Sequence, residues 1–356
     1  RPLLWLEEAH RLGASVLSSP NFGFKHVHKV FRSKGLDDVR LDRVRLIYNG
    51  AEPILPEVCR EFLEAMAPFG LRHETMFPVY GLAEASLAVT IPAPGRAFPT
   101  LQLNRRRLGV SDTVELVDAD DPDAIELVGC GHPLDHCDCR IADDGGQTLP
   151  DATVGRIQIR GGNVTDGYLG PQGDIEQPFT ADGWLDTGDL GFFRDGELYV
   201  CGRSKEILFV NGENYYPHEL ESVAAKQGAT ELGKIANAAV RQPCTREDLE
   251  QVIAFLLHRG SPEDFVSLSR QVRRALVEQT GVEVDRCVPV RTIPKTTSGK
   301  LQRRKLAAAY LAGEFAAEID AADAAIANAA APADASVSEI EQQLLDICAE
   351  VVVDQK

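Results

Sequence analysis

The sequence has no apolar run long enough to cross a membrane, and its first residues carry no signal-peptide pattern. These two absences favour a soluble protein without integral membrane segments, and a cytoplasmic location is expected. The chain is also short of positive charge, because 54 Asp and Glu residues outnumber 37 Lys and Arg residues and leave a formal net charge of −17. Binding to nucleic acid or to anionic membranes needs the opposite sign and is not expected.

The eight cysteines are spread along the chain and lack the dense pattern of a small disulfide-stabilised domain, so reduced thiols are expected. Residues 130–139 hold three cysteines and two histidines at close spacing, and these residue types can bind zinc. However, Cys137 and Cys139 alternate with polar residues, as in a β-strand, and Pro133 interrupts a helical arrangement of the histidines. A strand with reduced cysteines is therefore preferred to a zinc site.

A Walker loop, which binds nucleotide phosphates, is also missing. Residues 294–300 read Pro-Lys-Thr-Thr-Ser-Gly-Lys, and their last residues resemble such a loop. A Walker loop has a glycine five residues before its Gly-Lys pair and a Ser or Thr after it, but Pro294 and Leu301 occupy these positions. What remains is a turn-prone loop that presents one cation, Lys300, within a basic segment over residues 291–305. This segment either faces an anionic group or is an ordinary solvated run of charge.

Residues 1–202 show the patterns of a mixed α/β domain. Short apolar or alternating runs predict strands at residues 45–48 and 156–160, and residues 55–67 have helical spacing. The first residues also fit a helix.

A smaller α+β unit is expected over residues 203–315. Residues 251–257 form an apolar run that predicts a buried strand. Ser261 then provides a helix cap, followed by Pro262 and two acids, and Gly281 is a typical helix end.

Residues 316–336 are rich in alanine, with scattered acids and little to build a core, and are expected to be a linker that is helical in part. Residues 337–356 begin with a capping-box pattern at Ser338 and Glu341 and continue with apolar residues at helical spacing. They predict the first helix of another module. The chain starts without Met inside an expected helix and stops inside another, so it is expected to be cut at both ends.

Four further motifs carry side chains that can bind a nucleotide and its metal ion. Asn49-Gly50-Ala51-Glu52 is a small-residue turn that allows backbone to approach a flat base closely. Tyr80 and Glu84 offer a ring for adenine and a carboxylate for Mg²⁺. Taken alone, residues 49–52 also fit an ordinary turn, and Tyr80 also fits an aromatic residue of the core.

The third and fourth motifs are Asp189 in Thr187-Gly188-Asp189 and Arg203 in Gly202-Arg203-Ser204-Lys205. An aspartate between small residues at a strand end can accept hydrogen bonds from both ribose hydroxyls. Arg203, at the end of the next apolar run, can reach the same ribose. Each alone also fits a turn aspartate or a surface arginine.

In this order and spacing, the motifs resemble the adenylate-forming superfamily of acyl-CoA synthetases, luciferases and peptide-synthetase adenylation domains. The resemblance covers nearly all of residues 1–315 and is strongest over residues 183–221. It implies the adenylate-forming-enzyme fold, with part of a large N-terminal AMP-binding domain over residues 1–202 and a small mobile C-terminal domain over residues 203–315. It also implies a ligase that uses ATP and Mg²⁺ to join a carboxylic acid to AMP and then passes the acyl group to a thiol.

The resemblance assigns roles residue by residue. It implies Asn49, Gly50, Ala51, Glu52, Tyr80 and Gly81 near adenine, Asp189 and Arg203 at the ribose, Glu84 at Mg²⁺, Asn21 and Phe22 near the acyl substrate, Lys205 at the hinge between the domains, and Lys300 at the reacting carboxylate and α-phosphate. Lys300 and Glu84 are the expected catalytic residues.

Within the superfamily, the chain is most similar to fatty acyl-AMP ligases, through residues 19–24, 49–53, 127–131 and 211–217. The interval 91–126 is where the insertion of that family is expected. The resemblance implies activation of a fatty acid as acyl-AMP and transfer to the phosphopantetheine thiol of an acyl carrier protein, in polyketide, lipopeptide or lipid biosynthesis. The predicted helix after Ser338 would suit the start of a tethered carrier domain.

One departure from the superfamily is the missing Gly/Ser/Thr-rich loop with a Pro-Lys pair, which there holds the β- and γ-phosphates and is expected to precede Arg1. The isolated chain is therefore expected to be inactive or impaired. Two alternatives stay open: a fatty acyl-CoA ligase, and a non-catalytic adenylate-binding or interaction module.

Overall fold

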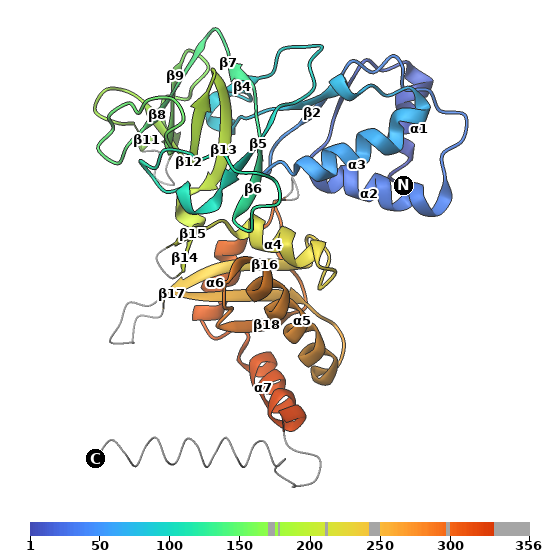
Figure 1. The fold of residues 1–356 in the computed structure, drawn as a ribbon, viewed down its shortest axis with the longest axis vertical. Helices are drawn as coiled ribbons and strands as arrows, with labels where there is room; N and C mark the ends of the chain where they lie inside the picture. The colour runs from blue at the N-terminus through green and yellow to red at the C-terminus, as the bar shows by residue number, and fades with distance from the viewer. Residues whose placement is uncertain (170–174, 177–178, 211–212, 242–249, 297–299, 331–356) are drawn as a thin grey trace.

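The computed structural model describes residues 1–169, 175–176, 179–210, 213–241, 250–296 and 300–330. We divide them into an N-terminal α/β part (residues 1–82), a β-rich part (residues 83–203) and a small α+β part (residues 204–330). The small part lies below the other two in Figure 1. Within the described ranges, no helix combines the length and apolar character needed to cross a membrane.

The N-terminal part is a short parallel sheet, in the order β1-β2-β3, packed with three helices. Its elements are α1 (Leu4–Leu12), β1 (Val16–Ser18), α2 (Asn21–Lys34), β2 (Leu46–Asn49), α3 (Pro56–Met66), the 3-10 turns η1 (Ala67–Phe69) and η2 (His73–Thr75), and β3 (Met76–Pro78). The predicted strand at 45–48 and helix at 55–67 are confirmed as β2 and α3. Helix α3 has proline in its first turn and buries Phe62 and Leu63 in the core beside Phe24 of α2.

The β-rich part is built on an antiparallel sheet in the order β13-β12-β9-β8. Its elements are η3 (Ala83–Ala85), β4 (Thr90–Ile91), β5 (Thr100–Asn104), η4 (Arg105–Arg107), β6 (Ala124–Val128), β7 (His132–Pro133), β8 (Cys137–Ala142), β9 (Gly155–Gly161), β10 (Tyr168–Leu169), β11 (Ile175–Glu176), β12 (Leu185–Arg194) and β13 (Glu197–Arg203). The alternating pattern at 156–160 correctly predicted β9, whose Ile157 and Ile159 are buried. The strand predicted at Cys137 is confirmed as β8.

The small part folds around a sheet in the order β16-β17-β18. Its elements are η5 (Ser204–Glu206), β14 (Leu208–Val210), β15 (Glu213–Tyr215), α4 (Pro217–Lys226), β16 (Ile235–Arg241), β17 (Glu250–Leu257), α5 (Pro262–Thr280), β18 (Arg286–Val290), α6 (Arg303–Leu311) and α7 (Ala316–Ala330). The predicted buried strand is β17, which pairs antiparallel with β16 and parallel with β18. The helix predicted from Ser261 is α5; Ser261 and Asp264 form a full capping box, and Gly281 ends the helix in a left-handed conformation.

Helix α7 lies within the segment expected to be a linker. It packs against α5 and β18, and its Ala322 and Ala325 are buried. Small alanine side chains allow this close approach of two helices, so a composition without large apolar residues still forms a packed element here. The helix predicted after Ser338 lies outside the described residues, and the domain boundaries expected from the sequence remain a prediction.

Helix α4 lies at the junction between the small part and the β-rich part (Figure 1). Just before α4, the Tyr216 ring is buried in the core of the β-rich part with Phe192 and Tyr199. Its hydroxyl donates to the Leu108 carbonyl at 3.2 Å. A Cβ at Gly202 would lie 2.4 Å from the Tyr216 ring, so only glycine leaves room for it there. Tyr216 therefore anchors the start of the small part in the β-rich part.

A buried ion pair crosses the same junction. Arg105 of η4 contacts Glu219 of α4, and their side chains are only 8% and 7% exposed. Burial raises the pKa of Glu219, while the charge of Arg105 acts in the opposite direction. Each charge depends on its partner, because a buried charge without a counter-ion is costly.

Replacing Arg105 with alanine should therefore destabilise the chain by about 3–5 kcal/mol, since it leaves the Glu219 carboxylate buried and unpaired. Urea unfolding curves measure this loss. The matched change Arg40→Ala breaks an exposed pair with Asp42, whose side chains are 76% and 53% exposed, and should cost less than about 1 kcal/mol. Equal effects of the two changes would contradict a junction that depends on the buried pair.

Candidate functional site

Three of the predicted site segments follow three neighbouring parallel strands. Asn21 and Phe22 begin α2 shortly after β1, Asn49 is the last residue of β2, and Tyr80 comes two residues after β3. Carboxyl ends of parallel strands meet at one edge of a sheet, where ligands of α/β proteins usually bind. The structure therefore brings the Asn21, Asn49 and Tyr80 segments together at one edge, as the motifs predict.

Asn21 supports this edge from within. Its side chain is buried, its Nδ2 donates to the Pro53 carbonyl at 2.6 Å, and its Oδ1 accepts from Asn49 Nδ2 at 3.3 Å. The Asn21 amide thus holds the turn after β2, and its expected position near the acyl substrate stays a prediction. Phe22 beside it is half exposed.

The turn after β2 is held closely against the neighbouring strand end. The Val79 N–H donates to the Asn49 carbonyl at 2.8 Å, and a Cβ at Gly50 would lie 3.0 Å from the Val79 carbonyl oxygen. Ala51 has a positive φ of 71°, and Glu52 accepts a hydrogen bond from the Phe22 N–H at 3.1 Å. Residues 49–52 are thereby fixed beside the segment that carries Tyr80.

The centre of the candidate site is a cluster of Tyr80, Asp189 and Arg203. The Tyr80 hydroxyl donates to Asp189 Oδ2 at 2.8 Å, and Arg203 Nε lies 3.2 Å from Asp189 Oδ1. Asp189 and Arg203 are also paired residues of β12 and β13. The aspartate and arginine predicted to share a ligand are therefore neighbours, and Tyr80 joins them to the parallel sheet.

Asp189 lies inside β12 rather than at the strand end that the sequence predicted. The pairing of β12 with β9 is interrupted between Asp186 and Leu190, and Gly188 has a φ of 75°. Such an irregularity re-aims a side chain without ending the strand. The interruption therefore accounts for the turn-like sequence around Asp189.

The charges around Asp189 come from two parts of the molecule. Burial raises the pKa of Asp189, and the hydrogen bond from Tyr80 and the positive charges of Arg203 and Lys300 oppose this effect. Lys300 of the small part is thus near enough to act on the carboxylate. Its own side chain is exposed.

The backbone around Lys300 is a short hairpin. The Thr296 N–H donates to the Lys300 carbonyl at 2.8 Å, the Lys300 N–H donates to Thr296 Oγ1 at 3.0 Å, and Lys295 pairs with Leu301. Residues 297–299 of the motif lie outside the described ranges. The hairpin fixes the base of the Lys300 side chain, whose charge is free to approach an anion.

Glu84 lies in η3, where one of its oxygens accepts a hydrogen bond from the Tyr168 hydroxyl at 2.7 Å. A Cβ at the nearby Gly81 would lie 2.0 Å from the Leu87 carbonyl oxygen, so this loop closes tightly only with glycine. The described residues contain no group of three or more His, Cys, Asp or Glu that could hold a metal ion. A single carboxylate nevertheless fits Mg²⁺, which usually keeps its waters and takes other oxygens from phosphates.

Two of the three cysteines in residues 130–139 are poorly suited to act as nucleophiles. Burial raises the pKa of Cys130 and Cys139 to about 12. Both thiols therefore stay protonated near neutral pH, and a thiol is a weak nucleophile compared with a thiolate.

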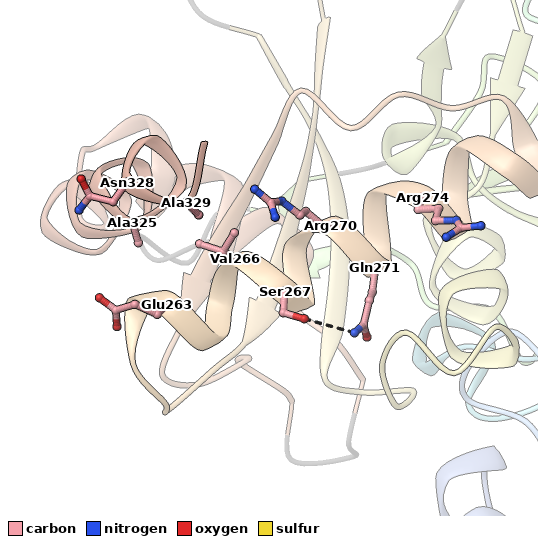
Figure 2. A pocket seen from close by; sticks show the side chains of 9 residues that line it. All are labelled: Glu263, Val266, Ser267, Arg270, Gln271, Arg274, Ala325, Asn328 and Ala329. Carbon is pink, nitrogen blue, oxygen red and sulfur yellow. Dashed lines mark hydrogen bonds between the residues drawn. The ribbon is translucent and has the colours of Figure 1, made fainter. Parts of the chain in front are cut away.

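A separate groove lies between α5 and α7 (Figure 2). Arg270 and Arg274 of α5 and Ala325 of α7 are among the residues that line it. No residue of the Tyr80 cluster does, so this groove is not part of the candidate site.

Sequence reasoning missed a group of charged residues around the predicted hinge. Glu206 follows Lys205 in η5, and both Glu206 and Glu221 pair with Arg303, three residues after Lys300. For Glu206 and Arg303, the positions close to Lys205 and Lys300 were the only sequence signal. Glu221 lies close to neither lysine in the sequence, because the contacts join distant residues.

The chain has the adenylate-forming-enzyme fold. The features that define it are the edge of the parallel sheet, the paired Asp189 and Arg203, and the nearby lysine of the small α+β part. Residues 1–169 match the family model of AMP-binding enzymes. A solved chain from a structural and functional study of fatty acyl-adenylate ligases from E. coli and L. pneumophila superposes with a TM-score of 0.79 at 29% identity, over 89% of this chain and 56% of the matched one.

Among curated relatives, the long-chain-fatty-acid–AMP ligase FadD32 of Mycobacterium marinum is 30% identical over 84% of this chain and 54% of its own length. A Caulobacter vibrioides relative that carries the name of an acyl-CoA synthetase is 33% identical, over 84% of this chain and 52% of its own. The chain thus spans about half the length of these relatives. The resemblance to fatty acyl-AMP ligases of the AMP-binding superfamily is confirmed.

The junction next to the site has a pH-sensitive residue, His218 of α4. Burial, together with the positive charge of Arg303, lowers the pKa of His218 from 6.5 to about 3. The unfolded chain therefore takes up a proton near pH 6.5 that the folded chain accepts only near pH 3. Neutral His218 therefore does not reduce the stability of the folded chain above pH 6.5, and the free energy of unfolding falls as the pH drops from 6.5 towards 3.

We expect the variant His218→Gln to lose less stability than the parent chain when the pH falls from 6.5 to about 4. Urea unfolding at a series of pH values measures the difference between the two proteins. Buried carboxylates such as Glu221, whose pKa burial raises, titrate in both proteins and cancel in this difference. The exposed His73→Gln serves as the control and should leave the pH dependence unchanged. Parallel curves for parent and His218→Gln would refute the assignment.

Proposed function

We propose that this chain is part of an ATP-dependent fatty acyl-AMP ligase. The enzyme activates a fatty acid as acyl-AMP and then transfers the acyl group to the phosphopantetheine thiol of an acyl carrier protein, in the cytoplasm. The observation that carries the proposal is the cluster of Tyr80, Asp189 and Arg203 at the edge of the parallel sheet, with Lys300 close by. The names of the relatives support the fatty-acid substrate.

In the first step, a carboxylate oxygen of the fatty acid attacks the α-phosphorus of ATP, and the bond to pyrophosphate breaks. Two anions approach each other, so the step needs positive charge at the reacting oxygens. Lys300 supplies that charge from its exposed position on the hairpin. Asp189 accepts hydrogen bonds from the ribose hydroxyls, Arg203 approaches the same ribose, and Tyr80 orients the Asp189 carboxylate and contacts adenine with residues 49–52 and Gly81.

Glu84 would hold Mg²⁺ through its carboxylate, and the bound ion would neutralise charge on the ATP phosphates. The contact with Tyr168 orients that carboxylate. The half-exposed Phe22 offers apolar surface to the fatty acid, while Asn21 keeps the turn after β2 in place.

In the second step, the thiol sulfur attacks the acyl carbonyl and AMP leaves. We propose that the small part rotates about Lys205 between the two steps. Arg291, Lys295, Arg304 and Lys305 are exposed on the small part and give a basic edge on which an acidic carrier could dock. If the acceptor is coenzyme A instead of a carrier protein, the enzyme is a fatty acyl-CoA ligase. The alternative to an enzyme is a non-catalytic adenylate-binding or interaction module.

The nucleotide contact can be tested without turnover. Asp189→Ala removes the acceptor for two ribose hydroxyls, so the affinity for AMP should fall about 10- to 100-fold. Isothermal titration calorimetry with AMP and with a non-hydrolysable acyl-adenylate analogue measures it. Asp138→Ala, which removes an exposed aspartate on β8, is the matched control. Unchanged AMP affinity in Asp189→Ala would exclude this residue from the site.

The acceptor is tested in the longer enzyme that contains this chain, supplied with ATP, labelled fatty acid, and equal amounts of carrier and coenzyme A. We expect the label mainly on the carrier. Arg304→Glu should slow carrier loading about tenfold and leave acyl-AMP formation unchanged, because it reverses one charge of the docking edge. Arg270→Glu, an exposed arginine on α5, is the control. Label on coenzyme A alone would indicate the acyl-CoA ligase, and no acyl-AMP at all would indicate the non-catalytic module.

A further inference from the structure

Lys205 lies between two residues that are tied to different parts of the molecule. On its N-terminal side, the Ser204 hydroxyl donates to the Gly188 carbonyl of β12 at 3.0 Å. Arg203, one residue earlier, pairs with Asp189 of the same strand. The chain up to Ser204 is therefore fixed to the β-rich part.

On its C-terminal side, Glu206 is tied to the small part. Arg303 Nη1 donates to Glu206 Oε2 at 3.0 Å, and the same guanidinium makes two further hydrogen bonds to Glu221 of α4 at 2.8 and 2.7 Å. Glu221 also accepts from the Asn237 N–H of β16 at 3.0 Å. The side chains of Arg303 and Glu221 are only 13% and 3% exposed, so this connection is shielded from water.

We propose that Ser204 and the Arg303–Glu206 ion pair are positioning groups that confine rotation between the two parts to Lys205. Rotation about the backbone of Ser204 would break its bond to Gly188, and rotation about Glu206 would pull its carboxylate away from Arg303. Lys205 lies between these anchors, and its side chain is exposed. The inference rests on the proposed function only where it links this rotation to the two reaction steps.

Arg303 also connects the pivot to the predicted catalytic lysine. It is the first residue of α6, and the N–H of the preceding Gln302 donates to the Pro294 carbonyl at 2.9 Å, which closes the base of the Lys300 hairpin. The guanidinium that holds Glu206 therefore also holds the helix from which this hairpin projects. Glu206, α4 and the Lys300 hairpin are therefore connected, and a rotation at Lys205 that moves them together also has to release Tyr216 and Glu219 from the β-rich part.

The choice of test variant follows from the charges of Arg303, Glu206 and Glu221. One guanidinium serves two carboxylates, and burial raises the pKa of Glu221 despite the charge of Arg303. Removing Arg303 would leave Glu221 buried without a counter-ion and could unfold the small part. Removing Glu206 leaves the two Arg303–Glu221 bonds in place and releases only the pivot.

The experiment is hydrogen exchange, followed by mass spectrometry, on the whole chain and on its variant Glu206→Ala. Loss of a charge-assisted hydrogen bond should speed amide exchange over residues 205–208 about tenfold. The matched control is Glu126→Ala, since the Glu126 side chain is 20% exposed against 22% for Glu206. Glu126 accepts two hydrogen bonds from Arg60, which join the N-terminal part to the β-rich part and do not involve the small part. This control should leave residues 203–208 unchanged. Ser204→Ala should speed exchange at residues 203–205 instead.

Unchanged exchange over residues 203–208 in both Glu206→Ala and Ser204→Ala would overturn the inference, whatever the activity. In the longer enzyme, Glu206→Ala should lower the ratio of acyl transfer to adenylation about tenfold. An unchanged ratio would remove the link between the pivot and the reaction. Absence of adenylation in the unaltered enzyme would refute the proposed function, and the exchange result would still decide on the pivot.

Discussion

Burying a carboxylate is costly unless a cation accompanies it, and this constraint shapes the junction of the molecule. The chain has far more acids than bases, yet its important buried acids have each been given a cationic partner from another element. These pairs are Asp189 with Arg203, Glu219 with Arg105, and Glu221 with Arg303. Each pair needs two distant segments to be correctly placed, so each one reports on the arrangement of the fold.

Helix α4 carries two buried glutamates, and each of them is paired with an arginine. Glu219 and Glu221 are two residues apart, which places them about 200° apart around a helix. Glu219 therefore turns towards Arg105 of the β-rich part, while Glu221 turns towards Arg303 of the small part. Together with Tyr216, which is buried in the β-rich core, these contacts fix α4 between the two parts. Helix α4 thereby helps to set the position of Lys300 relative to Asp189.

Local patterns predicted local structure well, because capping and alternation act over a few residues. The capping box at Ser261 and the alternating segment of β9 are confirmed for this reason. The burial of Asn21 and the place of Asp189 inside β12 could not be predicted, since they depend on residues from other elements.

The candidate site shows the same division. The motif order led to the adenylate-forming fold, and the edge formed by three parallel strands follows from their connections. The hydrogen bond between Tyr80 and Asp189 joins residues that are 109 apart in sequence, and the bonds from Arg303 to Glu221 span 82. No periodic pattern links such positions, so the network around the pivot became visible only in three dimensions. The roles of the individual site residues remain predictions.

The two ion pairs of α4 would behave differently in the proposed rotation. The Arg303–Glu221 pair lies within the small part and moves with it, whereas the Arg105–Glu219 pair crosses the junction and has to separate. Separation into water restores the hydration of both charges, and that hydration offsets most of the lost attraction. Deleting one partner gives no such compensation, because the other charge stays buried. A buried ion pair at this junction can thus be needed for stability as a pair and still be opened reversibly.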